Sequence, residues 1–184
     1  MDLSKKCILI TGGARSGKSR FAQELAVRSG KPVLFVATAT AGDEEMKRRI
    51  EEHRKSRPAV WSVLEATTYI GSQIEKRAGG AGVVLVDCLT LLLNNIFSQE
   101  IEEQVDEARL EKEVMAEIKE LLGCIDRVDA DFIIVTNEVG LGLVPMSKIG
   151  RLYRDLLGVA NQRLAERADE VYIMIAGLPV KIKP

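Results

Sequence analysis

Several features that would narrow down a function are scarce or missing in this 184-residue chain. The three cysteines, Cys7, Cys88 and Cys124, are odd in number and form no C-x-x-C pair, so we expect neither a disulfide framework nor a zinc site. No run reaches the roughly 18 apolar residues of a membrane span. No apolar signal stretch follows Met1, and we therefore expect a cytoplasmic protein.

The chain also lacks an excess of charge of either sign. Its 26 basic and 27 acidic residues give a net charge of −1. Proteins that bind nucleic acids or anionic membranes usually carry a basic excess, so neither partner is expected. A hydrophobic content of 46% is ordinary for a globular protein, and the length suits a single domain over residues 1–184.

Apolar strand candidates alternate with helical patterns along the chain. We expect strands at 7–11, 33–37, 61–65, 83–87, 132–136 and 171–176, and helices at 18–29, 44–55, 68–77, 89–97, 105–125 and 149–168. The alternation predicts an α/β fold with a mainly parallel sheet and helices on both faces. Residues 180–183 follow Gly177-Leu178-Pro179 too closely for a crossover, so they should form an antiparallel edge hairpin with 171–176.

The most informative motif is GGARSGKS, which fits the phosphate-binding P-loop pattern G-x-x-x-x-G-K-[ST]. It comprises Gly12, Gly13, Ala14, Arg15, Ser16, Gly17, Lys18 and Ser19. In such a loop, Lys18 reaches the β- and γ-phosphates and Ser19 ligates Mg²⁺. The alternative is a glycine-rich turn without a ligand, but the apolar strand before the motif and the amphipathic helix after it favour a P-loop NTPase-like fold.

Two carboxylates follow apolar strands. Asp87 ends the strand Val83–Val86, where P-loop enzymes place an acid that coordinates magnesium. The alternative is a cap for the helix that begins near Leu89. Glu65 ends the strand at 61–65 and could contact a ribose or a base, or cap the next helix.

His53 is the only histidine, and it lies in the basic run Arg49 to Arg57. One interpretation is a histidine packed on an apolar helix stripe. The other is a nucleophile: nearby cations disfavour imidazolium, so a neutral His53 could attack an α-phosphate that the same cations hold. The basic run itself could equally be a solvated helix face.

The segment Thr136-Asn137-Glu138-Val139-Gly140 follows an apolar strand and suits either a site loop or a plain turn. Asn137 and Glu138 are therefore candidates for substrate contact. The base-reading motif N-K-x-D of switch GTPases does not occur here.

Taken together, these segments resemble the bifunctional adenosylcobinamide kinase / adenosylcobinamide-phosphate guanylyltransferase family of cobalamin biosynthesis. The resemblance runs from Ile8 to Lys183 and includes the P-loop, DEEMKRRIEEHRKSRPAVW, VVLVDCLTLLLNN, VTNEVGLGLVP and YRDLLGVANQRLA. It implies that ATP or GTP phosphorylates adenosylcobinamide. GMP from GTP then passes through a guanylylated histidine to adenosylcobinamide phosphate, which gives adenosylcobinamide-GDP.

The resemblance also assigns residues. It makes His53 the guanylylated histidine and Lys18 a catalytic residue, and it implies Mg²⁺ at Ser19 and Asp87 and a homotrimer. Beyond the P-loop, it implies nucleotide contacts at Ala37, Thr38, Ala39, Arg54, Lys55, Ser56, Arg57, Glu65 and Asp87.

One departure from the family pattern is Glu52, which stands where some relatives have a second histidine beside the first. It places an anion beside His53 that could alter nucleotide affinity. Two other functions remain open from the sequence. They are a small-molecule kinase in which His53 is structural, and a nucleotide-binding module without catalysis.

Overall fold

The computed structural model describes residues 5–40, 42, 44–98, 100 and 105–184, apart from the side chains at positions 45, 49, 53 and 56. Within these residues, seven strands form one sheet in the order β3-β2-β4-β5-β1-β6-β7. The strands are β1 Cys7–Gly12, β2 Val33–Ala37, β3 Ser62–Glu65, β4 Val83–Asp87, β5 Asp131–Val135, β6 Glu170–Ile175 and β7 Leu178–Lys183. All neighbouring strands pair in parallel except β6 and β7, which form the predicted antiparallel hairpin.

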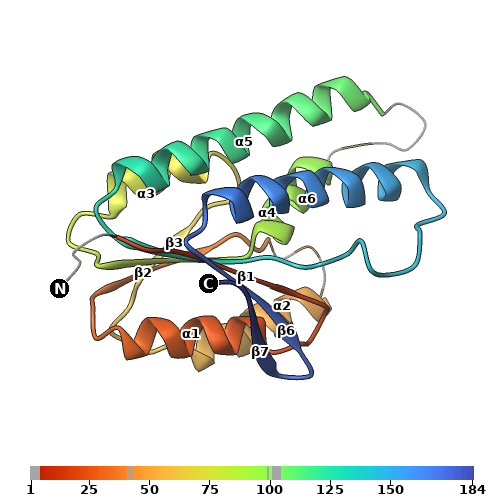
Figure 1. Ribbon diagram of the computed structural model, residues 1–184. Coiled ribbons are helices and arrows are strands. Elements are labelled where there is room, and N and C mark those ends of the chain that lie inside the picture. The colour runs from red at the N-terminus through yellow and green to blue at the C-terminus, as the bar shows by residue number, and fades with distance from the viewer. Residues whose placement is uncertain (1–4, 41, 43, 99, 101–104) are drawn as a thin grey trace.

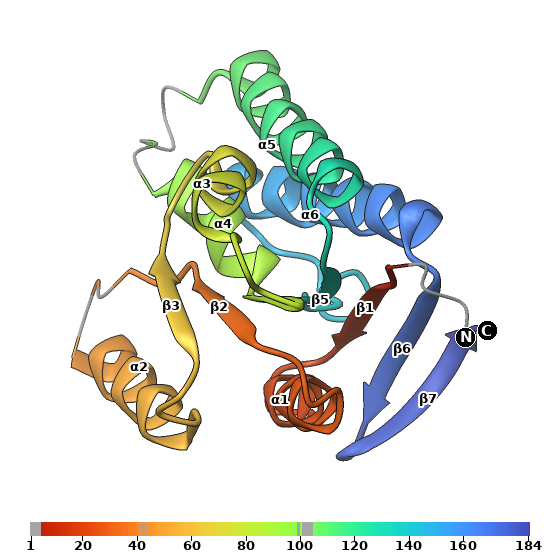
Figure 2. The same cartoon turned by 90° about the vertical axis from the view of Figure 1, so that its left-hand side faces the viewer.

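Six helices of the described residues lie on the two faces of this sheet (Figure 1). They are α1 Lys18–Arg28, α2 Glu44–Ser56, α3 Ile70–Arg77, α4 Leu89–Phe97, α5 Glu107–Arg127 and α6 Lys148–Arg167. Figure 2 shows α3 to α6 over one face, with α1 and α2 on the other. In the part of the chain that the structure describes, no helix combines the length and apolar character needed to cross a bilayer.

The strands divide their side chains between two cores because successive strand residues point to opposite faces. In β4, Val84 and Val86 join the larger core beneath α3 to α6, whereas Val83 and Leu85 join the smaller core beneath α1. All four side chains are at most 1% exposed. Full burial of such a side chain stabilises the fold by about 1.5–3 kcal/mol, so the central strands are held from both faces.

The α/β architecture and all thirteen elements are confirmed, with ends that differ by at most two residues. One difference matters for the site. Leu178 and Pro179 belong to β7, so the hairpin turn is Ala176-Gly177 and not the expected Gly177-Leu178-Pro179. Both turn residues have positive φ, 51° and 84°. Two-residue turns of this kind match the twist of antiparallel strands, and this explains why the strands can begin so close to the turn.

Candidate nucleotide site

The P-loop connects β1 to α1 at the carboxyl edge of the sheet. Gly12 ends β1, and Gly17 is the N-cap residue of α1, which begins at Lys18. Gly12, Arg15 and Gly17 have positive φ values of 140°, 56° and 94°, which turn the chain sharply between strand and helix. The loop is thereby placed at the amino end of α1, where unpaired N–H groups and the helix dipole favour an anion.

Lys18 is held across this loop. Its side chain is buried, and Nζ donates to the carbonyl of Gly13 at 2.6 Å and to Ser16 Oγ at 3.5 Å. Burial lowers the pKa of Lys18, while the nearby Cys88 and the Asp87 carboxylate oppose that shift. The P-loop ammonium and the acid at the end of β4 are therefore electrostatic neighbours, as the two motifs together predict.

The β6–β7 hairpin packs against the P-loop, a contact that sequence patterns did not indicate. The backbone N–H of Gly177 donates to the carbonyl of Ser16 at 3.1 Å. A Cβ on Gly12 would lie 2.6 Å from the backbone oxygen of Met174 in β6, so the close approach of β6 requires glycine there. The hairpin thus supports one side of the phosphate loop.

The acidic candidates lie in one row where the strands end. The sheet register pairs Ala37 of β2 with Glu65 on one side and Asp87 on the other. Asp87 is two residues beyond Leu85, which packs beneath α1, so it projects toward the same face as the P-loop helix. Asp87 is half-buried, whereas Glu65 is exposed at the outer strand β3.

Neither carboxylate caps a helix, so the capping alternatives are wrong. The N-cap of α4 is Cys88, without a side-chain cap, and α3 begins five residues after Glu65. The α3 terminus is capped across the core by Glu117 of α5, whose carboxylate accepts from the N–H groups of Tyr69 and Ile70 at 2.6 and 2.9 Å. Burial raises the pKa of Glu117, and these two hydrogen bonds oppose that shift. No sequence signal pointed to this long-range cap.

Thr38 braces the end of β4. Its hydroxyl donates to the carbonyl of Cys88 at 2.7 Å and accepts from the Cys88 N–H at 2.9 Å. The buried Asn95 of α4 donates to the carbonyls of Thr38 and Thr67, and its oxygen accepts from the Thr40 hydroxyl. Because the Thr38 hydroxyl is engaged inside the protein, a nucleotide would meet the backbone of 37–39 rather than this side chain. The sequence did offer one sign of this role, because Asn95 is a polar residue within the apolar run LLLNNIF at 91–97.

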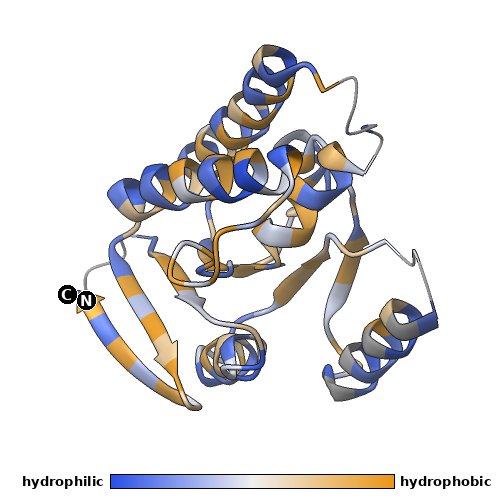
Figure 3. Ribbon diagram, turned by 90° about the vertical axis from the view of Figure 1, so that its right-hand side faces the viewer, coloured by the Kyte–Doolittle hydropathy of each residue, from blue (hydrophilic) through white to orange (hydrophobic). Residues whose placement is uncertain are grey.

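The structure places His53 in α2, but its side chain and those of Arg49 and Ser56 lie outside the described residues. Among the α2 side chains that are described, none is buried: Met46 and Ile50 are half-buried, and the rest are exposed. Hydrophilic colours dominate this helix in Figure 3. By the side chains that are described, the histidine-bearing helix therefore has little apolar attachment to the sheet.

Arg57, just beyond α2, anchors the basic segment. Its guanidinium lies 4.1 Å from the ring centroid of Phe35 in β2, and that ring also stacks on Trp61, with ring centroids 6.3 Å apart. Burial lowers the pKa of Arg57, while Asp87 and Glu65 favour its charged form. Arg57, Asp87 and Glu65 come from different segments of the chain and are therefore close enough to interact electrostatically at this edge of the sheet.

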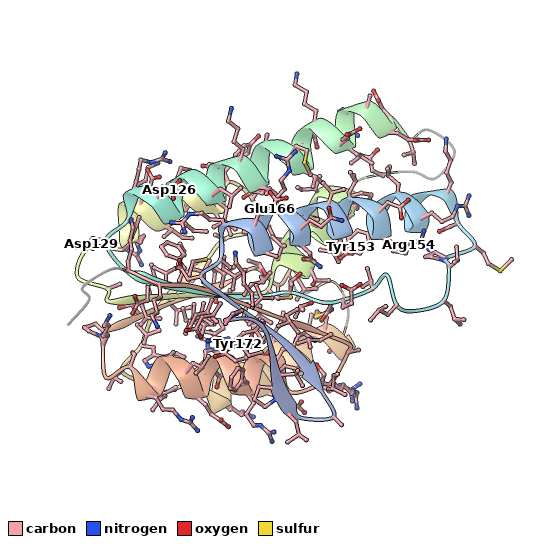
Figure 4. The ribbon with its side chains drawn as sticks, viewed as in Figure 1. Asp126, Asp129, Tyr153, Arg154, Glu166 and Tyr172 are labelled. Carbon is pink, nitrogen blue, oxygen red and sulfur yellow. The ribbon has the colours of Figure 1, made fainter. Side chains whose placement is uncertain are left out.

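The TNEVG segment is held by a polar network between α4 and α6. Asn161 accepts from the Thr136 hydroxyl at 2.7 Å and donates to the Asn137 carbonyl at 3.0 Å. The Asn137 N–H donates to Thr90 Oγ1 at 2.8 Å, and Tyr153 of α6, labelled in Figure 4, donates its hydroxyl to the Thr90 carbonyl. These contacts fix Thr136 and Asn137 at the edge of the sheet, and a substrate contact at Asn137 or Glu138 stays a prediction. Asn161 lies within YRDLLGVANQRLA, one of the segments that carry the family resemblance, but the sequence analysis gave this residue no role.

The donor set fits magnesium better than a transition metal. Among the described residues, no three His, Cys, Asp or Glu side chains form a metal cluster. Ser19 at the start of α1 and Asp87 offer one hydroxyl and one carboxylate oxygen. Mg²⁺ in phosphate-transfer sites typically uses one or two such protein ligands together with phosphate oxygens and water.

The structure therefore brings together the P-loop, Asp87 and Arg57, with Ala37 and Ala39 half-buried beside them. Glu65, Arg54 and Lys55 lie farther out and are exposed.

Comparison with known proteins identifies a family. A family model described as cobinamide kinase / cobinamide phosphate guanyltransferase matches residues 8–182. The bifunctional adenosylcobalamin biosynthesis protein CobP of Pseudomonas aeruginosa is 43% identical over 95% of this chain and 96% of its own. The proteins named CobU of Salmonella typhimurium and Escherichia coli are each 39% identical over 96% of this chain and 99% of their own.

Solved structures show the fold alone. A crystal structure of the RadB recombinase aligns with a TM-score of 0.52 at 14% identity, over 91% of this chain and 73% of that one. A Pyrococcus horikoshii protein aligns with a TM-score of 0.57 at 10% identity, over 98% and 88% of the two chains. These likenesses confirm the P-loop NTPase-like architecture.

Proposed function

Because the chain belongs to the cobinamide kinase / cobinamide phosphate guanyltransferase family, we propose that it catalyses two successive reactions of cobalamin biosynthesis. ATP or GTP first phosphorylates the alcohol of adenosylcobinamide. GMP from GTP then passes through His53 to adenosylcobinamide phosphate, giving adenosylcobinamide-GDP. The observation that carries this proposal is the P-loop at the amino end of α1, with the buried Lys18 bonded across it to the Gly13 carbonyl.

The kinase step uses the P-loop side of the site. Backbone N–H groups of residues 12–19 bind the β- and γ-phosphates, and the Lys18 ammonium stabilises the charge that develops on the transferring group. Ser19 and Asp87 would hold Mg²⁺, which when bound neutralises the phosphate oxygens. Positioning and charge stabilisation account for most of such a reaction, and no protein nucleophile is required.

The guanylyl step uses α2. A neutral His53 attacks the α-phosphorus of GTP, a P–N bond forms, the bond to the β-phosphate oxygen breaks, and pyrophosphate leaves. The ring proton passes to solvent. An oxygen of adenosylcobinamide phosphate then attacks the same phosphorus and releases His53. Arg54, Lys55 and Arg57 supply positive charge for the triphosphate, and the charges of Asp87 and Glu65 favour the charged form of Arg57.

We also propose that the 184 residues act as one catalytic domain, that the protein is cytoplasmic, and that it assembles as a homotrimer with sites near the subunit boundaries. These proposals rest on the family membership.

The test is incubation with GTP labelled in the α-phosphate, followed by mass analysis of the intact chain. We expect one GMP adduct that is labile in acid and stable in alkali, because protonation makes the imidazole a good leaving group. His53→Ala should abolish labelling and guanylyl transfer but leave most of the kinase activity, with ATP and GTP each tried as donor. Glu51→Ala, an exposed position on the same helix, is the control and should label normally.

Labelling that persists in His53→Ala, or an acid-stable adduct, would identify another nucleophile. Loss of both activities in a folded His53→Ala protein would mean that His53 instead serves nucleotide binding in both steps.

A further inference from the structure

The segment between β5 and α6 leaves the sheet beside the P-loop. β5 lies between β1, which carries the loop, and β4, which carries Asp87. The backbone N–H of Glu138 donates to the carbonyl of Gly12 at 3.0 Å, so the segment is attached to the first residue of the P-loop. Figure 1 shows the segment running out past the carboxyl ends of the strands before it returns to α6.

The Glu138 carboxylate is held in place at this position. Its Oε1 accepts from the N–H of Gly140 at 2.7 Å, and the side chain is half-buried. The residues before it are fixed by the Thr136–Asn161 and Asn137–Thr90 hydrogen bonds described above. Glu138 therefore presents a proton acceptor from a braced backbone, in the segment that follows β5, the strand between β1 and β4.

The residues that follow Glu138 expose an unusual amount of apolar surface. Leu141, Leu143 and Met146 are 84%, 97% and 98% exposed, and Val144 is also exposed. The segment is nevertheless tied at both ends. Gly142 N–H donates to the Val139 carbonyl at 3.3 Å, and Arg151 of α6 donates to the Met146 carbonyl at 2.6 Å. An apolar surface this exposed in a protein commonly marks a binding site.

Position decides which ligand this surface fits. The segment that carries it is attached to the phosphate loop by the Glu138–Gly12 hydrogen bond. The alcohol that receives the γ-phosphoryl group must stand at that loop, while the rest of its molecule extends outward. In the proposed function, on which this inference rests, the acceptor is a corrinoid, whose large ring offers far more apolar surface than a small alcohol would.

We propose that residues 138–146 form the acceptor side of the kinase site. Glu138 is the general base: it takes the proton of the acceptor hydroxyl as that oxygen bonds to the γ-phosphorus. The bond from that phosphorus to the bridging oxygen breaks, and the nucleoside diphosphate leaves. Leu141, Leu143, Val144 and Met146 bind the apolar part of the corrinoid and so bring its hydroxyl to the loop.

The first test is Glu138→Gln, with the exposed α5 substitution Glu111→Gln as its control. The amide keeps an oxygen for the Gly140 N–H but is not basic. General-base catalysis contributes about 10²–10⁴-fold, so kcat for cobinamide phosphorylation should fall by about 100-fold or more. The KM for the nucleotide should stay within about twofold of wild type. Labelling of His53 by GTP, which involves no acceptor hydroxyl, should persist.

A kinase kcat within about threefold of wild type would overturn the role of Glu138. So would loss of GMP labelling together with the kinase in a folded protein, because that would make Glu138 a support of the P-loop. A wild-type protein that phosphorylates no corrinoid would instead refute the proposed kinase function, and GMP labelling would still report separately on the guanylyl step.

The second test is the double substitution Leu141→Ser and Leu143→Ser, with the exposed Val27→Ser of α1 as the control. We expect the KM for cobinamide to rise by about tenfold or more, because the bound corrinoid would cover both leucine side chains and serine removes this apolar contact. Light scattering should show an unchanged oligomer. An unchanged KM, or a smaller assembly, would overturn the binding surface, and the smaller assembly would assign it to contacts between copies of the chain.

Discussion

α1 and α2 lie on the same face of the sheet, yet they are attached to it very differently. α1 buries Lys18, Ala22 and Ala26 and begins directly at the P-loop. α2 has no buried side chain among those described and is anchored at its end by Arg57 on Phe35. The comparison suggests a division of labour. The lysine predicted to bind phosphate is part of the core, whereas the predicted nucleophile lies on a helix whose described side chains have little apolar contact.

The largest effect is expected from Lys18→Ala, which tests the α1 side. Removal of the ammonium should reduce kinase turnover by several orders of magnitude, because it stabilises the charge of the transferring phosphates. Guanylyl transfer should also weaken if both reactions share this phosphate site. Steady-state kinetics with intact thermal unfolding provide the measurement. Kinase turnover within about twofold of wild type would contradict the assigned role.

A matched pair of isoleucines tests the difference in packing. Ile10 of β1 is fully buried beneath α1, whereas Ile50 of α2 is half-buried. Ile10→Ala should lower the free energy of unfolding by about 2–5 kcal/mol, because it removes buried atoms and leaves a cavity. Ile50→Ala should cost less than about 1 kcal/mol, measured by urea denaturation. Equal losses would show that α2 is packed as firmly as α1.

Arg57→Ala tests the anchor of α2. Cation–π contacts contribute about 0.5–2 kcal/mol, so the rate of GMP labelling should fall by about tenfold, with a smaller effect on the kinase step. Arg57→Lys keeps the charge but not the planar stacking, and it should restore labelling only in part. Fluorescence of Trp61, the only tryptophan, reports on the same ring cluster. Equal loss of both activities would argue against a role specific to α2.

The smallest effect is expected when the folded protein is treated with a reagent that modifies cysteine thiols. Burial raises the pKa of Cys7, Cys88 and Cys124 to about 12 in each case. At pH 8 the neutral thiol dominates, and an aromatic disulfide reagent should modify none of them quickly until urea is added, since the thiolate is the reactive form. Fast reaction of Cys88 alone would show that the junction between β4 and α4, where Cys88 lies, opens in solution.

Much of the fold follows from local patterns. Continuous apolar runs such as Val83–Val86 predicted strands buried on both faces, and GGARSGKS predicted the sharp turn and helix start that the structure has. Asp87 was placed at the end of its strand by the same pattern. These features depend on side-chain periodicity and backbone sterics within a few residues, so they can be read along the chain.

Contacts between distant segments could not be predicted in this way. Glu117 caps α3 from α5, Asn95 joins the segments that follow β2 and β3, and Gly177 bonds to Ser16 of the P-loop. Each depends on how strands and helices are ordered in space, and hydrogen-bond partners far apart in sequence leave no periodic signal.

By itself, the sequence determined the element types, the phosphate loop and the candidate acids, because these follow from local spacing. Only the tertiary structure decided which of them meet. The strand order puts β5 between β1 and β4, so Glu138 lies at the P-loop, and the sheet register sets Glu65 and Asp87 on either side of Ala37. Packing of both sheet faces fixes that register, because a slip of one residue would move each side chain into the opposite core, where it would not fit its neighbours.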